Sequence, residues 1–239
     1  MNETLQLLQT AAEPFGISLT DNQLQQFGRY QALLIEWNQR LNLTRIIEPH
    51  DIIIRHFLDS LTCATVMGEV TDQKVIDVGT GAGFPGLPLK ILYPDIHLTL
   101  VDSVTKKTTF LAAVVEALGL TAVTISDGRA EEIGQQPAYR EQYDWVVARS
   151  VAEMRILAEY LLPLGRVGGY LLAQKGENAA EEVKSAYQSI RILGGGRVQM
   201  HEVRLPDHEL THHLVVIPKE RPTPKKYPRR PGLPSKRPL

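Results

Sequence analysis

Hydrophobic and polar residues follow two different spacings along the chain. In the first 68 residues the apolar positions recur every three or four residues, the spacing of an amphipathic helix. The pattern predicts helices over residues 3–16, 21–38 and 49–67. Thr20-Asp21-Asn22-Gln23 has the form of a capping box at the start of the second helix. The polar stretch 37–45 predicts a loop before the third helix.

From Lys74 to Pro218, short apolar runs alternate with helical patterns, which predicts strands joined by crossover helices. We expect strands over 74–78, 97–102, 122–126, 143–148 and 169–176, and helices over 106–118, 152–162 and 178–192. A final antiparallel pair is expected over 197–204 and 213–217. The alternation predicts an α/β fold with a doubly wound, mostly parallel sheet and right-handed crossovers.

Three parts follow from these patterns: an N-terminal helical extension (residues 1–68), an α/β domain (69–218) and a C-terminal tail (219–239). Seven prolines between Pro218 and Pro238 predict a tail that is extended, without helix or central strand. The tail has eight Lys or Arg against one acid, a charge of +7, whereas the rest has 18 basic and 26 acidic residues, a charge of −8. The tail is therefore a candidate contact for RNA phosphates, and a solvated terminus is the alternative.

The composition narrows the class of protein. With 43% hydrophobic and 22% charged residues, the chain has the make-up of a folded globular protein. A single cysteine, Cys63, excludes a disulfide framework and a cysteine-based zinc site, and we expect no metal. The start of the chain has no signal-peptide pattern, and no apolar run approaches the ~20 residues of a membrane span. We therefore expect a cytoplasmic protein without membrane attachment.

A glycine-rich loop follows the first predicted strand, in the sequence Asp77-Val78-Gly79-Thr80-Gly81-Ala82-Gly83-Phe84-Pro85-Gly86. Glycines let a ligand touch the backbone, and such loops hold nucleotide-like ligands in α/β sheets. Residues 81–86 match the dinucleotide fingerprint, which aims free N–H groups at a pyrophosphate. Pro85 and Pro88 lack that group, so we predict S-adenosylmethionine, which has no phosphate and whose cationic end suits a nearby carboxylate. A loop without ligand is the alternative.

Other polar residues end the remaining predicted strands. Asp102 follows Gly83 by nineteen residues, which suits a carboxylate that accepts both ribose hydroxyls. The clusters 127–131, 149–150 and 175–176 end three more strands, so we expect the site along this one edge of the sheet. In the third predicted helix, spacing brings Arg55, His56 and Asp59 close together, as a surface ion pair and histidine or as part of a cleft.

Together these motifs resemble the RsmG (GidB) family of methyltransferases, which modify N7 of a guanine in bacterial small-subunit ribosomal RNA. The likeness covers nearly the whole chain. It is carried by Trp37-Asn38 with Asn42-Leu43-Thr44, Arg55-His56-Phe57-Leu58-Asp59-Ser60, the glycine loop, Leu100-Val101-Asp102-Ser103 with Lys106, Arg129-Ala130-Glu131, Ala148-Arg149-Ser150-Val151-Ala152, Lys175-Gly176, and Tyr227-Pro228-Arg229-Arg230-Pro231-Gly232.

The resemblance implies a Rossmann-like fold of the class I S-adenosylmethionine-dependent methyltransferases. It also implies a cofactor site. The glycine backbone would pack on the methionine part, Asp102 would hold the ribose, the Ala130-Glu131 pair would meet the adenine, and Arg149 would pair with a ligand carboxylate or phosphate. The implied cofactor residues are Gly79, Gly81, Gly83, Phe84, Asp102, Ser103, Ala130, Glu131 and Arg149.

The implied reaction transfers the methyl group of S-adenosylmethionine to guanine N7 in 16S ribosomal RNA. N7 has a free lone pair and no proton, so no general base is required and alignment supplies the rate. The guanine would enter a pocket lined by Asn42, His56, Asp59, Arg149 and Ser150. We expect a monomer that acts on 16S RNA or on the small subunit. The alternatives are a small-molecule methyltransferase, a non-catalytic RNA-binding assembly factor and a dinucleotide oxidoreductase.

Overall fold

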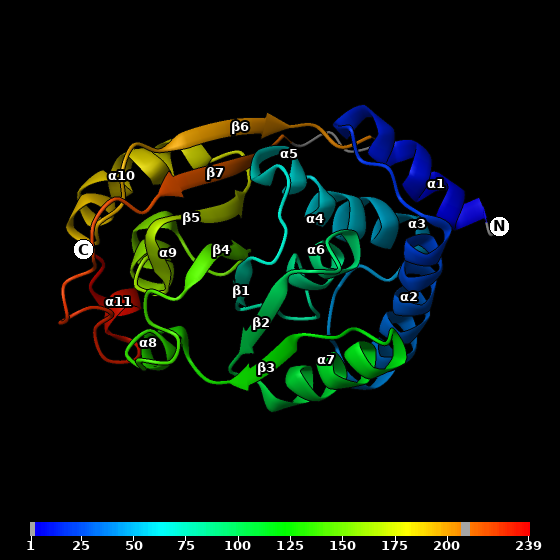
Figure 1. The fold of residues 1–239 in the computed structure, drawn as a ribbon, viewed down its shortest axis with the longest axis horizontal. Helices are drawn as coiled ribbons and strands as arrows, with labels where there is room; N and C mark the ends of the chain where they lie inside the picture. Colours follow the sequence, from blue (N-terminus) through cyan, green and yellow to red (C-terminus); the bar gives the residue numbers. More distant parts are fainter. Residues whose placement is uncertain (1–2, 207–210) are drawn as a thin grey trace.

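The computed structural model describes residues 3–206 and 211–239, and these residues form one seven-stranded sheet with helices on both faces (Figure 1). The strand order is β3-β2-β1-β4-β5-β7-β6. Strands β1 to β5 are parallel, and β7 runs antiparallel to both β5 and β6. The predicted doubly wound sheet and its final antiparallel pair are confirmed. The strands are β1 Lys74–Val78, β2 His97–Asp102, β3 Val123–Asp127, β4 Tyr143–Arg149, β5 Gly165–Lys175, β6 Gln199–Val203 and β7 His212–Pro218.

The helices fall into an N-terminal group, the sheet crossovers and a single C-terminal turn. The N-terminal group is α1 Glu3–Ala12, the 3-10 helix η1 Glu13–Phe15, α2 Asp21–Leu41, α3 Pro49–Ile52, the π-helix η2 Ile53–Leu58, α4 Asp59–Leu61 and α5 Ala64–Met67. The others are α6 Gly86–Leu92, α7 Thr105–Ala117, α8 Ala130–Ile133, α9 Met154–Leu161, α10 Ala179–Ile192 and α11 Leu233–Lys236. Within the described ranges, none of these helices is both long and apolar enough to cross a membrane.

Each face of the sheet has its own apolar core. The N-terminal helices, α6 and α7 cover one face, where Phe27 and Phe57 pack in the same cluster as Val75. On the opposite face, α8, α9 and α10 pack against residues such as Ile76, whose side chain points away from that of Val75 because side chains alternate along a strand. Burying apolar area at about 25 cal/mol per Å² stabilises both layers. The N-terminal helices therefore complete the core of the α/β domain.

Helix α2 is longer than the pattern predicts, because its end is fixed by hydrogen bonds rather than by apolar spacing. The capping box at Thr20 is present, with the Gln23 N–H donating to the Thr20 hydroxyl at 3.3 Å. At the other end the side chain of Asn38 bonds to both the N–H and the carbonyl of Thr44. Asn42, in the left-handed region at φ 49°, then ends the helix after Leu41.

The predicted helix 49–67 is divided, and its centre is the π-helix η2. A π-helix adds a residue to a turn, so side chains four apart no longer lie one above the other. The expected pair between Arg55 and Asp59 is therefore not formed. Arg55 lies 3.5 Å from Asp51, and Asp59 pairs with Arg149 of β4 at 2.8 Å. The local irregularity turns Asp59 from the helix surface toward the edge of the sheet.

The C-terminal tail is packed against the domain, contrary to the expectation of an extended segment. Residues Leu233–Lys236 form a helical turn, α11, which starts after Gly232 in the left-handed region. Arg229 lies 2.6 Å from the carboxylate of Glu159, whose side chain is fully buried. Lys219, only 2% exposed, donates to the carbonyls of Leu162 and Leu193. Two of the eight basic tail residues thus serve the fold.

The buried ion pair yields a prediction about stability. In an Arg229→Ala variant, the buried carboxylate of Glu159 loses the guanidinium that pairs with it, and breaking such a pair costs about 3 kcal/mol. Urea denaturation should show this loss. The neighbouring exposed Arg230→Ala variant should remain within about 0.5 kcal/mol of the parent. Equal stability of both variants would show that the tail is not anchored by this contact.

Candidate functional site

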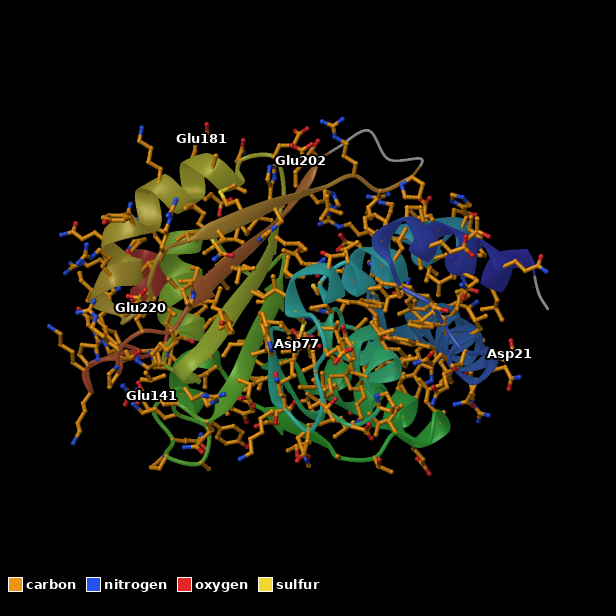
Figure 2. All side chains as sticks on the ribbon, turned by 45° about the horizontal axis from the view of Figure 1, so that its top comes forward. Asp21, Asp77, Glu141, Glu181, Glu202 and Glu220 are labelled. Carbon is orange, nitrogen blue, oxygen red and sulfur yellow. The ribbon has the colours of Figure 1, made fainter. Side chains whose placement is uncertain are left out.

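Asp77, at the end of β1, organises the glycine loop. One oxygen of its carboxylate accepts from the Thr80 hydroxyl at 2.6 Å and from the Gly86 N–H at 2.8 Å. The side chain is fully buried, and Figure 2 shows it in the middle of the molecule. Burial raises the pKa of Asp77 to about 6, against the lowering effect of those two hydrogen bonds.

This carboxylate occupies the start of α6, the place where a phosphate would bind. A helix N-terminus attracts anions through its free N–H groups. Here the Gly86 N–H is taken by Asp77, the Leu87 N–H bonds to the Gly83 carbonyl, and Pro85 and Pro88 have none. The geometry agrees with the expectation that the loop does not hold a pyrophosphate. Asp77 itself lies inside the loop and lines neither cavity described below, so it is not the carboxylate expected beside the ligand.

The three glycines of the loop have different roles. Gly79, at φ +70°, borders open space, but a Cβ there would lie 2.7 Å from Val151. Gly81, at φ +63°, faces open space. Gly83, at φ +102°, lies so close to Tyr30 and Leu87 that a Cβ would be 2.5 Å from each. Gly79 and Gly81 therefore present backbone to the cavities described below, whereas Gly83 allows α2 to pack on the loop.

A cavity of about 330 Å³, the Asp102 cavity, lies at the ends of β1 to β4. It collects most of the residues expected to hold a cofactor: Gly79, Asp102, Ser103, Ala130 and Glu131. Three wall residues that the sequence did not single out are Lys107, Tyr160 and Ser235, whereas Arg129 and Gly232, which also line the cavity, belong to motifs that carried the resemblance. The motif that carried the resemblance includes Lys106, but it is Lys107 that faces the cavity.

The carboxylate of Asp102 is held in place from three sides. It accepts from the Gly81 N–H at 2.9 Å and from the Val104 N–H at 3.0 Å, and Lys107 lies 3.3 Å away. A carboxylate offers about four lone-pair sites, so it retains capacity to accept from a ligand hydroxyl. The same bonds tie the glycine loop to the end of β2.

A second cavity of about 410 Å³, the Arg149 cavity, adjoins the first. The two share Gly79, Lys107 and Ser150. Its other walls come from the N-terminal helices and the loop between α2 and α3, from the glycine loop, from the end of β4 and from the start of β7. They include Thr44, Arg55, His56, Asp59, Gly81, Phe84, Arg149 and His212. Segments from both the extension and the α/β domain therefore build this part of the site.

Arg149 is the centre of the polar contacts in this cavity. Its guanidinium donates to the carboxylate of Asp59 at 2.8 Å, to the carbonyl of Arg55 at 3.1 Å and to Nδ1 of His56 at 3.1 Å. It also lies over the ring of Phe84, 4.9 Å from the centroid. The fork of the guanidinium thus holds the N-terminal helices against the end of β4.

His56 is held as a neutral imidazole. A guanidinium cannot accept a hydrogen bond, so Nδ1 must be the acceptor from Arg149 and Nε2 carries the proton. Nε2 donates to the Thr44 hydroxyl at 2.8 Å. Burial first, and then the positive charge of Arg149, lower the pKa of His56 to about 3. With both nitrogens engaged, His56 positions its neighbours and is poorly suited to act as a base.

Asp59 stays ionised despite its burial. Burial raises the pKa of its carboxyl, but the hydrogen bond from His212 at 3.1 Å and the charge of Arg149 outweigh that effect and lower it. His212 comes from β7, and nothing in the sequence had pointed to it. Asp59 therefore joins α4, β4 and β7 in one contact.

Two predicted residues differ in position from the others: Phe84 is almost completely buried beneath the Arg149 cavity, and Asn42 lies outside both joined cavities. Phe84 is 4% exposed and stacks with His56 at 4.4 Å and with Tyr30 at 5.5 Å, so it supports the floor of the Arg149 cavity. Asn42 ends α2 and lines a separate hollow with Ile35. The structure brings His56, Asp59, Arg149 and Ser150 together but does not bring Asn42 to them.

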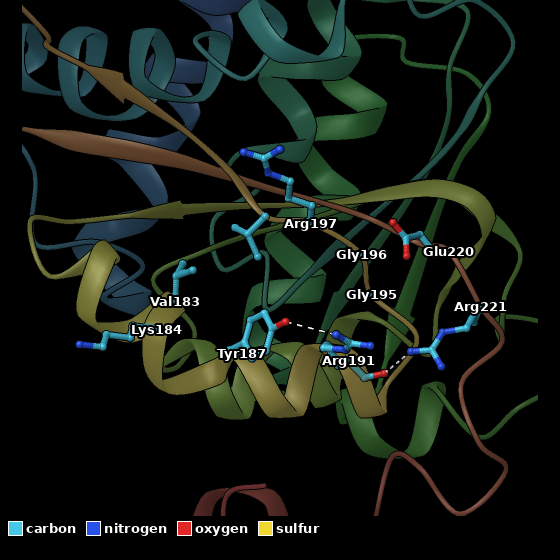
Figure 3. A pocket seen from close by; sticks show the side chains of 10 residues that line it. Val183, Lys184, Tyr187, Arg191, Gly195, Gly196, Arg197, Glu220 and Arg221 are labelled. Atoms are coloured by element: carbon cyan, nitrogen blue, oxygen red, sulfur yellow. Dashed lines mark hydrogen bonds between the residues drawn. The ribbon is translucent and has the colours of Figure 1, made fainter.

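The largest described cavity lies elsewhere, with about 680 Å³ between α10 and the segments before β6 and after β7 (Figure 3). Arg191 and Tyr187 of α10 contact each other there at 3.2 Å, and Arg197 and Glu220 face them. It contains none of the residues predicted for the site and none of the glycine loop. Ligands of α/β sheets bind at the carboxyl ends of the strands, so the two joined cavities remain the candidate site.

Comparison with known proteins identifies the family. The model of the GidB family, described as rRNA small subunit methyltransferase G, matches residues 23–211. The chain belongs to this family. It is 46% identical to the ribosomal RNA small subunit methyltransferase G of Alkaliphilus metalliredigens over 99% of both chains, and 50% identical to that of Roseiflexus castenholzii over the whole of both. The resemblance drawn from the motifs is confirmed. The family model ends before the C-terminal tail.

Solved structures support the fold. A 16S rRNA (adenine(1408)-N(1))-methyltransferase from Catenulisporales acidiphilia has a TM-score of 0.52 at 17% identity, covering 64% of this chain and 88% of that one. The [4+2]-cyclase SpnF has a TM-score of 0.54 at 14% identity, covering 68% and 81%. Since a cyclase shares the fold, the architecture alone does not establish the reaction. The family match and the site carry that inference.

The low pKa of His56 predicts a pH effect on stability. The folded protein favours the neutral form of His56. The contribution of this residue to the free energy of unfolding is therefore complete above the ordinary pKa of 6.5 and is lost as the pH falls toward 3. Between pH 6.5 and pH 4 the free energy of unfolding of the parent, measured by urea denaturation, should fall by about 1 kcal/mol per pH unit more than that of a His56→Gln variant. His97→Gln, at an exposed histidine, is the matched control and should follow the parent. Parallel curves for the parent and His56→Gln would contradict the assignment.

Proposed function

We propose that this chain transfers the methyl group of S-adenosylmethionine to N7 of a guanine in 16S ribosomal RNA. The observation that carries the proposal is the junction of two cavities at Gly79, Lys107 and Ser150, in a chain of the methyltransferase G family. One cavity suits the donor and the other suits the acceptor base. Curated relatives that align over the full chain are named as ribosomal RNA small subunit methyltransferases.

The residues of the Asp102 cavity fit the donor. Asp102 would accept from the ribose hydroxyls, Ala130 and Glu131 would lie at the adenine end, and Gly79 and Gly81 would contact the methionine part through their backbone. Ser103 lies beside Asp102 at the same wall. The donor supplies an activated methyl group on a positively charged sulfur. It carries no phosphate, which matches a helix start whose N–H groups are already used.

The Arg149 cavity fits a base that needs no deprotonation. Guanine N7 has a free lone pair, so the protein must hold and align the ring rather than remove a proton. This agrees with the neutral, fully engaged state of His56. Asp59, ionised beside Arg149, offers negative charge near a ring that becomes positive during the transfer. We assign the acceptor side to His56, Asp59, Arg149 and Ser150.

The finer properties follow from the same assignment. We propose that the substrate is 16S RNA or the small subunit, that the protein acts as a cytoplasmic monomer, and that the exposed basic residues of the C-terminal tail contact RNA phosphates. Lys225, Lys226 and Arg230 are exposed, whereas Lys219 is buried and Arg229 mostly so. The extension, residues 1–68, supplies one wall of the acceptor site rather than a separate activity.

The function is tested by incubating the protein with labelled S-adenosylmethionine and unmodified small-subunit RNA, free or assembled, and mapping the methylated base. We expect label at a single guanine, with chemical cleavage specific for N7-methylguanine at that position. An Arg149→Ala variant should lose about 100-fold in kcat/KM, because misplacing reacting groups by an ångström has that effect. Arg40→Ala, at an exposed pair on α2, should retain parental activity.

Label on another atom, or on small molecules only, would refute the proposed reaction. Binding of the donor and RNA without transfer would favour the assembly-factor alternative. Parental turnover in a folded Arg149→Ala variant would remove Arg149 from the site. The conservative Arg149→Lys variant keeps the charge but not the fork, so recovery in that variant would show that charge alone suffices.

Replacing Lys225, Lys226 and Arg230 together by alanine should weaken RNA affinity and flatten its dependence on salt. Each phosphate contact contributes about 0.7 to the slope of log K against log salt for single strands, so a change of about 2 is expected. Filter binding over a salt series measures it. Binding of S-adenosylhomocysteine should be unchanged. An unaltered slope would exclude Lys225, Lys226 and Arg230 from the RNA interface.

A further inference from the structure

The C-terminal tail follows a defined path against α8 and α9, on the side of the molecule away from the N-terminal helices (Figure 1). Arg229 anchors the tail through its ion pair with Glu159. In the part of the tail that precedes Arg229, the carbonyls of Thr223 and Tyr227 accept from the Arg140 guanidinium, both at 2.7 Å. At the far end the Leu239 carbonyl accepts from the Arg155 side chain at 3.0 Å. The tail is thus fixed at several points along its length.

Between these anchors the tail reaches the Asp102 cavity. Gly232 and Ser235 line the cavity together with Tyr160 of α9. The Gly232 N–H donates to the carboxylate of Glu131 at 2.9 Å, and the hydroxyls of Ser235 and Tyr160 lie 3.0 Å apart. Gly232 has φ +78°, a conformation that glycine adopts without strain, which lets the chain turn there. The tail therefore supplies a wall that the α/β domain alone lacks.

The position of this wall along the cavity follows from its contacts. Glu131 lies at the end of the cavity assigned to adenine, and Gly232 bonds to it directly. Hydroxyls both donate and accept, so the bond between Ser235 and Tyr160 can be exchanged for bonds to a ring nitrogen or an amino group. Binding sites enclose most of their ligand, and here the tail closes what would be an open side.

We propose that residues 232–235 of the tail, with Tyr160, form the part of the donor site that contacts the adenine end of S-adenosylmethionine. This inference rests on the proposed function, because it takes the Asp102 cavity to be the donor site. The tail is then a positioning element of the donor site, and its exposed basic residues are a separate feature.

The test uses full-length protein and S-adenosylhomocysteine, with the dissociation constant measured by calorimetry. A Ser235→Trp variant places a large ring at the cavity wall and should weaken binding at least tenfold. Lys236→Trp, at the next residue, which is exposed and does not line the cavity, is the matched control and should stay within twofold of the parent. Both variants should keep the parental melting temperature without ligand, since neither residue is buried.

The outcomes separate the two proposals. If the parent binds S-adenosylhomocysteine and Ser235→Trp binds equally well, the tail proposal is overturned and the donor assignment stands. If the parent does not bind it, the donor assignment fails and this inference fails with it. Removal of residues 232–239 should also weaken binding at least tenfold, and parental affinity in that truncated protein would equally overturn the proposal.

A readout independent of substitution is the cleavage of the parent by trypsin after Lys236. Arg230 and Arg237 precede prolines, so the bond after Lys236 reports the α11 turn, and mass spectrometry detects loss of the last three residues. A ligand that contacts both tail and domain stabilises the docked tail. Saturating S-adenosylhomocysteine should slow this cleavage at least fivefold, and an unchanged rate would contradict contact between tail and ligand.

Discussion

The structure of the site depends on a carboxylate buried at the start of a helix. Asp77 accepts from Thr80 and from the first N–H of α6, and so places a negative charge of the protein where other nucleotide-binding sheets receive a phosphate. Once that position is filled, the loop can offer a ligand only its glycine backbone and the nearby Asp102. A donor without phosphate is therefore the ligand that this loop accommodates. The raised pKa of Asp77 shows that burial of its carboxylate has an energetic cost, which its two hydrogen bonds offset only in part.

A second charged contact joins the two halves of the site. Arg149 and Asp59 come from segments ninety residues apart in sequence, and their pairing holds α4 against the end of β4. Buried ion pairs contribute little net stability, because desolvation opposes the attraction. Their value here is geometric: with His56 and His212 they fix the wall of the Arg149 cavity. The N-terminal extension thus belongs to the site as much as the sheet does.

Much of the fold could be predicted from the chain alone, since its signals are local. Alternating apolar runs and helical patterns indicated the parallel strands and their crossovers, and the final antiparallel pair was found at β6 and β7. The capping box at Thr20 was recognisable because both partners lie within four residues. The two prolines after the glycine loop were enough to predict a ligand without phosphate. The residues at the strand ends were correctly expected along one edge, because parallel strands end on the same side.

The remaining features depend on contacts between segments that lie far apart in the sequence. Spacing placed Arg55 next to Asp59, but the π-helix and Arg149 gave Asp59 another partner. Charge and proline content suggested a free tail, yet contacts with the buried Glu159 and Glu131 hold it against α8 and α9 and bring Ser235 to the Asp102 cavity. His212 carried no local signal at all. Local signals in the chain were thus sufficient for the strands and most crossover helices of the α/β domain, for the loop chemistry and for the family. The walls of the site depend on tertiary packing. The partner of each side chain lies far away in the sequence, and neither residue spacing nor composition specifies which residue that is.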